Sequence, residues 1–583
     1  MKGLRSHRLR GAAFVLATAV VVLTAGLTTS RPASAAGLST SDFHNTLIPA
    51  GGGEPSIAID THAGSPGLNN IYVVAPGGNG TPNCPLEEYS YDHGMNFSGH
   101  VFFDQGANAV KCGDSDVATL ANGNVVVTDL NVTHATVQVS TNFGQSFPNS
   151  TCVPVPGVGV CTNAATAPED DRPWLTAQGT STVYVAYHDF VLEVPIVCTS
   201  IDGGSTFSSC FQAYGASTSA QGNTGTSNCQ ENTIPSRSLQ VDPTDGSLNF
   251  MYACSSTLKN AQDPPYGPLY QFFLAHAAAV VNGVAPAYLT RTVYSPTPPT
   301  GTSPNYSNIF SSFRIDSQGN YYAVFDGTAD DNNVLANPYH VYLTVSKDKG
   351  INWTSPVEVD QPADPSNPGT NVFADFSVTT PGNVDIAWYH SPFTGEPNGV
   401  CGGTVQNTIG NTGCTQQQSP FTPAPNANAP GWNVYMAQSV NALCNAGPIP
   451  TCQKPLFTNV EVNANATHYG EICTNGIVCG SSDRSLLDFL SIGVDCNGAA
   501  HIAYPANAST TVGTNSGTDD VYVANQTSGS FIAPPASCSV LATAAPEAPL
   551  AVGLIIAGGA GIPVAVGLRR LALRRSKKSH SIG

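Results

Sequence analysis

Three arginines stand directly before segments that have the composition of β-strands, and their type and spacing suggest a binding chemistry. They are Arg172 in EDDRPW, Arg237 in IPSRSL and Arg484 in SSDRSL. The part of the chain from residue 37 to residue 547 holds only five arginines, so three of them at one kind of position are an unexpected concentration. Guanidinium groups bind a planar carboxylate in bidentate fashion. The three residues therefore predict a clamp for a carboxylate.

The other two arginines occupy different positions. Arg314, in SFRID, falls within a predicted strand and is a fourth candidate for ligand binding, whereas Arg291 falls in a stretch that we expect to be a loop. Two of the first three arginines follow an aspartate directly, and the third follows a loop that contains Glu231. An alternative is therefore that these arginines form ion pairs that join neighbouring structural units.

One pattern recurs seven times and must position these residues. It consists of a short apolar strand, a turn with Gly, Asn or Asp, and a second β-rich strand. The copies begin at Ser56, Val117, Trp174, Leu239, Phe313, Phe376 and Leu490. Tight hairpins need the positive φ that Gly, Asn and Asp supply. Such repeats predict an all-β fold, a β-propeller for which we prefer seven blades and keep six as the alternative.

A second motif, S-x-[DN]-x-G-x-x-[FW], occurs in the later part of four units. Ser and Asp or Asn can hydrogen-bond the backbone of a turn, Gly can take the left-handed conformation, and the aromatic ring can fill the blade. We therefore expect these residues to be structural rather than catalytic. The repeated positions are Ser90, Asp92 and Gly94; Ser140, Asn142 and Gly144; Ser200, Asp202 and Gly204; and Ser346, Asp348 and Gly350.

In these copies the chain resembles the sialidase superfamily, whose Asp boxes, or BNR repeats, are turns away from the active face. The resemblance covers roughly residues 50 to 535. It implies an arginine clamp for the carboxylate of a sialic-acid-like sugar, an Asp acid/base and a Tyr nucleophile polarised by a Glu. The implied catalytic residues are Asp171 or its neighbour Asp170, Glu231, and Tyr504 or Tyr469.

The first unit departs from the pattern of that family. The arginine-containing [FY]RIP motif is replaced by Glu54-Pro55-Ser56-Ile57, which has no arginine. We therefore expect a surface protein that recognises an extracellular glycan or another polymer. Sialidase-like glycoside hydrolysis is the alternative, and a structural role in the cell envelope is a second alternative.

Both ends of the chain carry signals for export and anchoring. Residues 1–35 combine a basic start, an apolar run and the small-residue site Ala33-Ser34-Ala35, which is the pattern of a signal peptide. The uncharged segment 548–568 is long enough to span a bilayer, and the basic tail 569–583 predicts a cytoplasmic C-terminus. The propeller then occupies residues 36–540, with a linker at 541–547. We expect a monomeric ectodomain at the cell surface.

The charge distribution argues against one class of binding partner. Charged residues make up 10% of the chain, and all 39 acidic residues lie between the two basic ends, so the predicted propeller is strongly acidic. Such a surface repels phosphate backbones, which argues against nucleic-acid binding. We predict no cofactor and no metal site. Acidic turns such as Asp330-Asp331-Asn332 have the oxygen ligands that Ca²⁺ prefers, so structural calcium is the alternative to a simple turn.

Sixteen cysteines fit an oxidising compartment, and none has the spacing of a zinc site. They fall into neighbours along the sequence, so we predict sequential disulfide pairing. The predicted pairs are Cys84/Cys112, Cys152/Cys161, Cys198/Cys210, Cys229/Cys254, Cys401/Cys414, Cys444/Cys452, Cys473/Cys479 and Cys496/Cys538.

Overall fold

The computed structural model confirms an all-β propeller and decides its blade number in favour of seven. It describes most of the chain between residues 37 and 539, which forms one compact unit. The described ranges are 37–48, 52–76, 86–102, 112–131, 134–154, 170–189, 194–213 without 208, 234–254 without 236 and 237, 270–281, 287–329 without 298, 300, 301, 303 and 307–310, 338–360, 368–397 without 396, 429–445, 454–474 and 483–539. The predicted signal peptide, linker, anchor and basic tail lie outside these ranges.

Each blade is an antiparallel sheet whose strands follow one another from the axis outward. Blade 1 consists of β2 (Ser56–Ile59), β3 (Ile71–Ala75), β4 (Leu86–Ser90) and β5 (Ser98–Phe102), and blade 2 of β6 (Cys112–Thr119), β7 (Val125–Asn131), β8 (His134–Ser140) and β9 (Asn149–Cys152). Blade 3 consists of β10 (Asp170–Gln178), β11 (Thr182–Asp189), β12 (Val194–Ser200) and β13 (Ser209–Gln212). In blade 4, β14 (Ile234–Pro235) and β15 (Gln240–Val241) both pair with β16 (Leu248–Cys254), and β17 (Gln271–Ala277) and β18 (Leu289–Tyr294) follow.

The last three blades follow the same plan. Blade 5 consists of β19 (Ser311–Ile315), β20 (Tyr321–Gly327), β21 (His340–Ser346) and β22 (Val357–Glu358). Blade 6 consists of β23 (Thr370–Val378), β24 (Val384–Ser391), β25 (Gly431–Ser439) and β26 (Thr458–Glu461), and β27 (His468–Tyr469) also pairs with β25. Blade 7 consists of β28 (Ser491–Val494), β29 (Ala500–Ala508), β30 (Asn515–Gln526) and β1 (Phe43–Ile48). Short 3₁₀ helices occupy Thr40–Asp42, Ala442–Asn445 and Ala536–Cys538.

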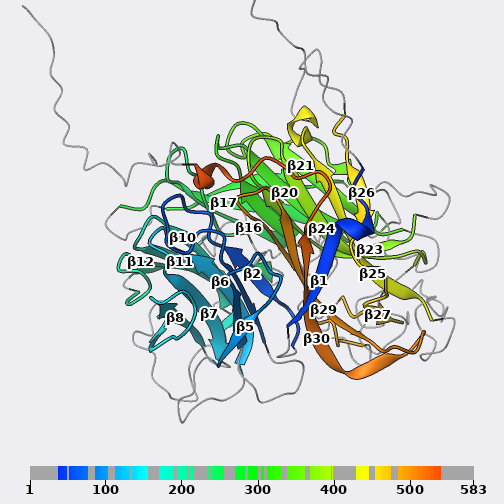
Figure 1. Cartoon of the computed structure of the whole chain (residues 1–583). Coiled ribbons are helices and arrows are strands. Elements are labelled where there is room, and N and C mark those ends of the chain that lie inside the picture. Colours follow the sequence, from blue (N-terminus) through cyan, green and yellow to red (C-terminus); the bar gives the residue numbers. More distant parts are fainter. Residues whose placement is uncertain are drawn as a thin grey trace, which may run out of the picture. The chain divides into compact units, whose positions relative to one another are not determined.

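The two ends of the described chain close the ring together. Strand β1 is the outermost strand of blade 7, where it pairs antiparallel with β30 from Phe43 opposite Gln526 to Ile48 opposite Val521. Figure 1 shows β1, in blue, beside β29 and β30, in orange. On the inside, β2 contacts both β6 and β28, so the inner strands also form a closed circuit.

Apolar side chains fill every seam between neighbouring blades. The second strand of each blade is almost continuously apolar and buried, as in IYVVA of β3 and YYAVFDG of β20, because another blade covers each of its faces. One large cluster joins blades 3, 4 and 5 and includes Trp174, Phe250 and Phe325. Separate clusters fill the remaining seams. This packing holds the starts of the inner strands in fixed positions around the axis.

The four predicted Asp boxes are turns between the third and fourth strands of their blades. In the box of blade 5, Ser346 Oγ donates to Asp348 Oδ1 at 2.8 Å and accepts from the Gly350 amide at 2.9 Å. The other three boxes repeat both contacts. Gly350 has φ +79° and a Cβ there would lie 2.7 Å from a leucine side chain of blade 4, so both conformation and space require glycine.

These boxes lie on the face of the ring opposite to the starts of the inner strands. Successive strands of a blade alternate in direction, so the turns after the first and third strands share one face. The connections that lead into each inner strand begin and end at the other face. The predicted binding residues therefore belong to the second face, which we call the axial face.

Two of the predicted disulfides are confirmed, Cys198–Cys210 within blade 3 and Cys496–Cys538 at the C-terminal end of the propeller. Cys152, Cys444 and Cys473 are also disulfide-bonded. These bonds fit an oxidising compartment. Among the described residues, no helix has the length and hydrophobicity needed to cross a membrane.

Candidate functional site

Arg172 and Asp488 meet at the axis of the ring. Arg172 lies in β10 of blade 3, and Asp488 lies just before β28 of blade 7. Arg172 Nη2 donates to Asp488 Oδ2 at 3.3 Å. Blades 3 and 7 are not neighbours in the ring, so this contact forms only because both side chains reach the centre of the axial face.

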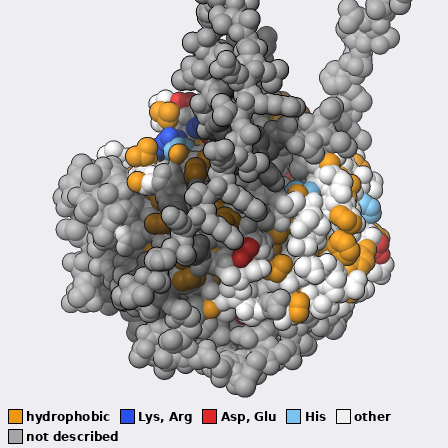
Figure 2. Space-filling model, turned by 90° about the vertical axis from the view of Figure 1, so that its left-hand side faces the viewer, with side chains coloured by type: hydrophobic (Ala, Val, Ile, Leu, Met, Phe, Trp, Pro, Cys, Tyr) orange, Lys and Arg blue, Asp and Glu red, His pale blue; other side chains and the backbone are white. Residues whose placement is uncertain are grey.

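Three more charged side chains complete this group. Arg484 Nη2 lies 3.0 Å from Asp488 Oδ2 and 3.7 Å from Glu54 Oε1, and Arg172 Nη1 lies 4.0 Å from Asp114 Oδ2. We call these five residues the axial cluster. Its members come from blades 7, 1, 2 and 3. Figure 2 shows that charged side chains are few among the described residues on the side of the molecule that faces the viewer.

The backbone that presents the axial cluster is strained. Glu54, Arg172 and Leu487 have φ values of 48°, 55° and 56°, in the left-handed region that such residues rarely adopt. Arg172 is followed by Pro173, which has no N–H for the sheet, and the pairing of β10 with β11 shifts register between Asp171 and Trp174. The bulge turns the Arg172 side chain to the axis. Strain of this kind is typical of functional sites.

An aromatic pair closes the centre of the ring beneath the charges. Trp174 lies two residues further along β10 than Arg172, and Phe489 directly follows Asp488. Their rings meet edge to face with centroids 5.5 Å apart, again between blades 3 and 7. Both side chains are buried. The axial cluster is therefore a polar floor at the axial face, supported by an apolar plug.

Burial and crowding of acids raise the pKa of Glu54. Burial, together with the charges of Asp114 and Asp488 and a hydrogen bond with Asp114, raises the pKa of Glu54 well above its ordinary value, against the opposing charge of Arg172. The pKa of His188, on β11, is lowered instead. Burial, aided by the Arg172 charge, lowers this pKa to about 4, so this imidazole is neutral near pH 7.

Two atoms of the axial cluster have unused hydrogen-bonding capacity. Among the described residues, Arg484 Nη1 and Asp488 Oδ1 are buried and have no hydrogen-bond partner. The Arg484 side chain is 15% exposed and that of Asp488 is 1% exposed. Arg484 is thus a partly exposed cation whose spare donor, Nη1, is itself buried.

Two further carboxyls, both influenced by the charge of Asp483, titrate close to neutral pH. Burial, followed by the charge of Asp483, raises the pKa of Asp519 to about 7. Burial also raises the pKa of Glu471 to about 7, against a backbone hydrogen bond and with the help of the Asp483 charge. Asp483 directly precedes Arg484 in the sequence.

The predicted arginines reach different places. The structure brings Arg172 and Arg484 together through Asp488. Arg314 instead donates to Asp375 Oδ1 at 3.1 Å and lies over the Phe376 ring, in a buried link between blades 5 and 6. Arg237 lies outside the described residues. The ion-pair alternative is thus present in part. The pairs Arg172–Asp114, Arg484–Glu54 and Arg314–Asp375 each join neighbouring blades, whereas the pair of Arg172 with Asp488 crosses the axis.

The predicted catalytic residues do not assemble with these arginines among the described side chains. Tyr504 lies on β29, and its hydroxyl donates to Asn45 Oδ1 at 2.7 Å on β1, the outermost strand of blade 7. Asp171 lies in β10 beside Arg172, but its side chain is outside the described part, as is the whole of Glu231. Tyr469, the alternative tyrosine, lies in the short strand β27.

Sequence reasoning missed the three acids of the axial cluster. Glu54, Asp114 and Asp488 stand close to the starts of inner strands, just as the predicted arginines do. That position was the available signal, but we applied it to arginines alone. The expectation for Arg291 was wrong in another way, because it lies in strand β18 and not in a loop.

The chain matches no protein-family model, and no curated protein matches its sequence. Among solved structures it is similar to a protein of unknown function from Dyadobacter fermentans, with 10% identity and a TM-score of 0.38 over 83% of this chain and 98% of that one. It is also similar to an α-L-arabinanase of Penicillium chrysogenum, with 10% identity and a TM-score of 0.34 over 59% and 90% of the two chains. A third similar structure is an ulvan lyase of polysaccharide lyase family 25, with 12% identity and a TM-score of 0.34 over 72% of this chain and 97% of that one. These are distant likenesses of fold, and the chemistry of the axial cluster has to be judged from its own residues.

Proposed function

We propose that this protein is an exported propeller that binds an extracellular glycan at the axial face. One observation carries the proposal: two arginines from opposite sides of the ring converge on Asp488, on strained backbone and above a buried aromatic plug. Strain and partly unsatisfied buried polar groups cost stability, so their concentration at the axis favours a role in binding.

The chemistry of the axial cluster suits a sugar. Arg484 Nη1 has a hydrogen to donate, and Asp488 Oδ1 has a lone pair to accept one; both atoms are buried, so a sugar reaches them only when the Arg484 side chain moves. Sugar hydroxyls both donate and accept hydrogen bonds, and an acidic sugar adds a carboxylate for the guanidinium group. Because Asp488 and Glu54 already lie beside Arg484, the cluster suits a neutral sugar or a singly charged one better than a polyanion.

Hydrolysis is the second candidate, and the state of Glu54 favours it. A buried carboxyl with a raised pKa beside other acids is a candidate general acid, with Asp114 and Asp488 as candidates for the ionised partner. In this second candidate Arg172, Arg237, Arg484 and Arg314 remain proposed substrate-binding residues. Asp171, Glu231 and Tyr504 remain the proposed catalytic alternatives.

The first experiment is a glycan-binding screen with the exported protein and its Arg484→Lys variant. Lysine keeps a cation beside Asp488 and Glu54, so the fold is retained, but it loses the second nitrogen of the guanidinium group. We expect binding to weaken at least tenfold. Arg291→Lys, on β18 of blade 4, is the matched control and is expected to bind as the wild type does.

Fluorogenic glycosides with and without a carboxylate then separate binding from hydrolysis. Turnover that Glu54→Gln abolishes while glycan binding persists supports the hydrolase. Binding without turnover, lost in Arg484→Lys, supports recognition alone. If both variants only change thermal stability, with binding and turnover as in the wild type, the axial cluster is a structural ion-pair group and the proposal fails.

A further inference from the structure

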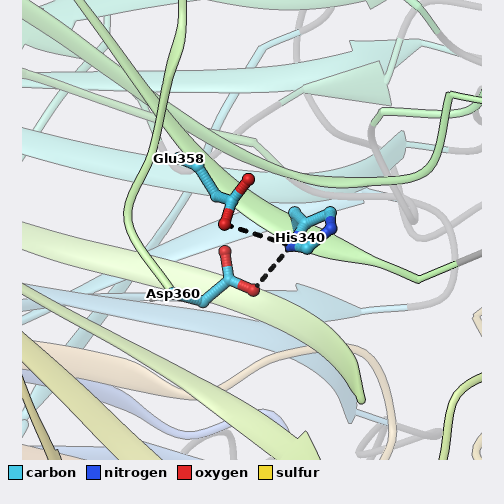
Figure 3. Close-up of side chains that lie close together, drawn as sticks. All are labelled: His340, Glu358 and Asp360. Carbon is cyan, nitrogen blue, oxygen red and sulfur yellow. Dashed lines mark hydrogen bonds and ion pairs between the residues drawn. The ribbon is translucent and has the colours of Figure 1, made fainter. Parts of the chain in front are cut away.

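A second polar cluster lies on blade 5, at its border with blade 6. His340 is the first residue of β21, Glu358 is the last residue of β22, and Asp360 follows two residues later. Figure 3 shows the two carboxyl groups turned toward the same imidazole nitrogen. His340 Nδ1 lies 3.0 Å from Asp360 Oδ2 and 3.8 Å from Glu358 Oε1. We call these three residues the rim cluster.

Neighbouring groups hold the buried carboxylate of the rim cluster in one orientation. The Val341 amide donates to Asp360 Oδ1 at 2.7 Å, and Asn371 Nδ2 donates to Asp360 Oδ2 at 2.6 Å. Asn371 belongs to β23 of blade 6 and is itself fixed, because its Oδ1 accepts from Trp388 Nε1 at 2.7 Å and from His390 at 2.8 Å. Outer hydrogen bonds of this kind are typical of metal ligands.

We propose that the rim cluster binds one divalent transition cation of the zinc type. One imidazole nitrogen and two carboxylate oxygens, all within 4.8 Å of one another, form a suitable set of three ligands. Calcium prefers six to eight oxygen ligands, so the imidazole disfavours it. Two carboxylates also balance the charge of the cation.

In the expected binding step the Nδ1 lone pair of His340 binds the cation. When the imidazole is neutral, the proton on Nδ1 that points to Asp360 moves through solvent to Nε2. When the ring is an imidazolium, the Nδ1 proton is released to solvent and Nε2 keeps its own. Ligand distances of about 2.0–2.2 Å place tetrahedral ligand atoms about 3.3–3.6 Å apart. The distances of 3.0 Å and 3.8 Å from His340 Nδ1 to the two carboxylate oxygens are close to this spacing, and all three ligand atoms lie within 4.8 Å of one another.

The three side chains leave the fourth coordination position to solvent or to a ligand. Asp360 and His340 are 5% and 15% exposed, whereas Glu358 is 39% exposed. The site is thus closed on the protein side and accessible past Glu358. A cation there joins β21 to the segment after β22 and, through Asn371, supports the border with blade 6. This proposal does not depend on the axial cluster.

The test uses the full chain purified after export, freed of metal with a chelator and titrated with Zn²⁺ in competition with a coloured chelator. We expect one high-affinity site per chain, lost at least tenfold in His340→Gln and in Asp360→Asn. Co²⁺ in place of Zn²⁺ is expected to show the visible bands of a low-coordinate nitrogen and oxygen site.

The control is His276→Gln, which alters a half-buried histidine on β17 whose Nδ1 contacts Asn249 rather than acids. It is expected to leave Zn²⁺ binding unchanged. Should circular dichroism show that the two buried variants do not fold, Glu358→Gln takes their place, because its side chain is the most exposed of the three. Equal affinity in the wild type and the rim variants, or no site at micromolar Zn²⁺, overturns the proposal.

Discussion

Asp385 provides a direct test of the electrostatics of the blade interior. It lies on β24 and is fully buried. Its Oδ1 accepts from Gln438 Nε2 at 3.1 Å, while its Oδ2 has no hydrogen-bond partner among the described residues. Burial raises the pKa of Asp385 from 3.8 to about 7, against the opposing effect of Gln438.

The sign of the effect on stability follows from this pKa. Between about pH 4 and about pH 7 the native protein keeps a proton that the unfolded chain releases, so the free energy of unfolding falls as pH rises. Each pH unit in that window is worth about 1.4 kcal/mol, which gives about 4 kcal/mol as an upper limit. Asparagine does not titrate, and its Oδ1 still accepts from Gln438.

We therefore expect Asp385→Asn to gain stability over the wild type as pH rises. The measurement is the midpoint of urea unfolding, followed by tryptophan fluorescence, at about pH 5 and about pH 8. Taking the difference between variant and wild type at each pH removes the contribution of every other group. A difference that does not change with pH would refute the reasoning, because it would mean that Asp385 is ionised in the folded protein throughout.

Asp348, in the Asp box of blade 5, supplies a control of opposite sign. Burial acts to raise the pKa of Asp348, but hydrogen bonds from Asn352 and Ser346 outweigh burial, so this pKa is lowered. Its stabilising contribution is present above the ordinary pKa and is lost in acid. Asp348→Asn is accordingly expected to lose stability relative to the wild type at about pH 8, by a small amount because the side chain is near solvent.

Three further predictions concern the fold, each read from thermal unfolding. Replacing both Cys496 and Cys538 by Ala removes a disulfide that spans 42 residues and is expected to lower the free energy of unfolding by about 4 kcal/mol. Once the wild type has been reduced, the variant and the wild type are expected to be equally stable. Trp174→Ala, at the axis, is expected to cost about 3–5 kcal/mol, and a loss below about 1 kcal/mol would mean that the aromatic plug does not pack as described. Gly350→Ala is expected to cost at least about 1–2 kcal/mol of the free energy of unfolding, because Gly350 has a positive φ. Gly517→Ala, whose added Cβ has no atom within 4 Å, is the control and is expected to change stability little. Equal losses of stability in the two variants would contradict the role of the positive φ in the Asp box.

Much of the fold was predictable because the signals are local in sequence. Each hairpin carries its own turn residues, and each Asp box carries its own serine, acid and glycine within five positions. The place of β1 was not predictable in this way. Its partner β30 lies more than 470 residues away, and FHNTLI has no turn or repeat that indicates a pairing.

The candidate site was predictable only in part for a similar reason. Position before an inner strand was enough to select Arg172 and Arg484, but their common partner is 316 residues from Arg172. Tyr504 was selected by residue type. Its hydroxyl, however, points to Asn45 on the outermost strand, because side chains of a strand alternate between two faces and the face was not fixed by the pattern.

The pairing of β1 with β30 also sets the order in which the protein can fold. The first strand to be synthesised has no partner until nearly the whole propeller has followed it, so its edge stays unpaired for most of synthesis. Contacts of such long sequence separation form slowly. Blades 1 to 6 can form from neighbouring segments, whereas blade 7 waits for both ends of the propeller. A chain interrupted late in synthesis is thus expected to leave an open ring with a free strand edge, a species prone to pair with its own copies.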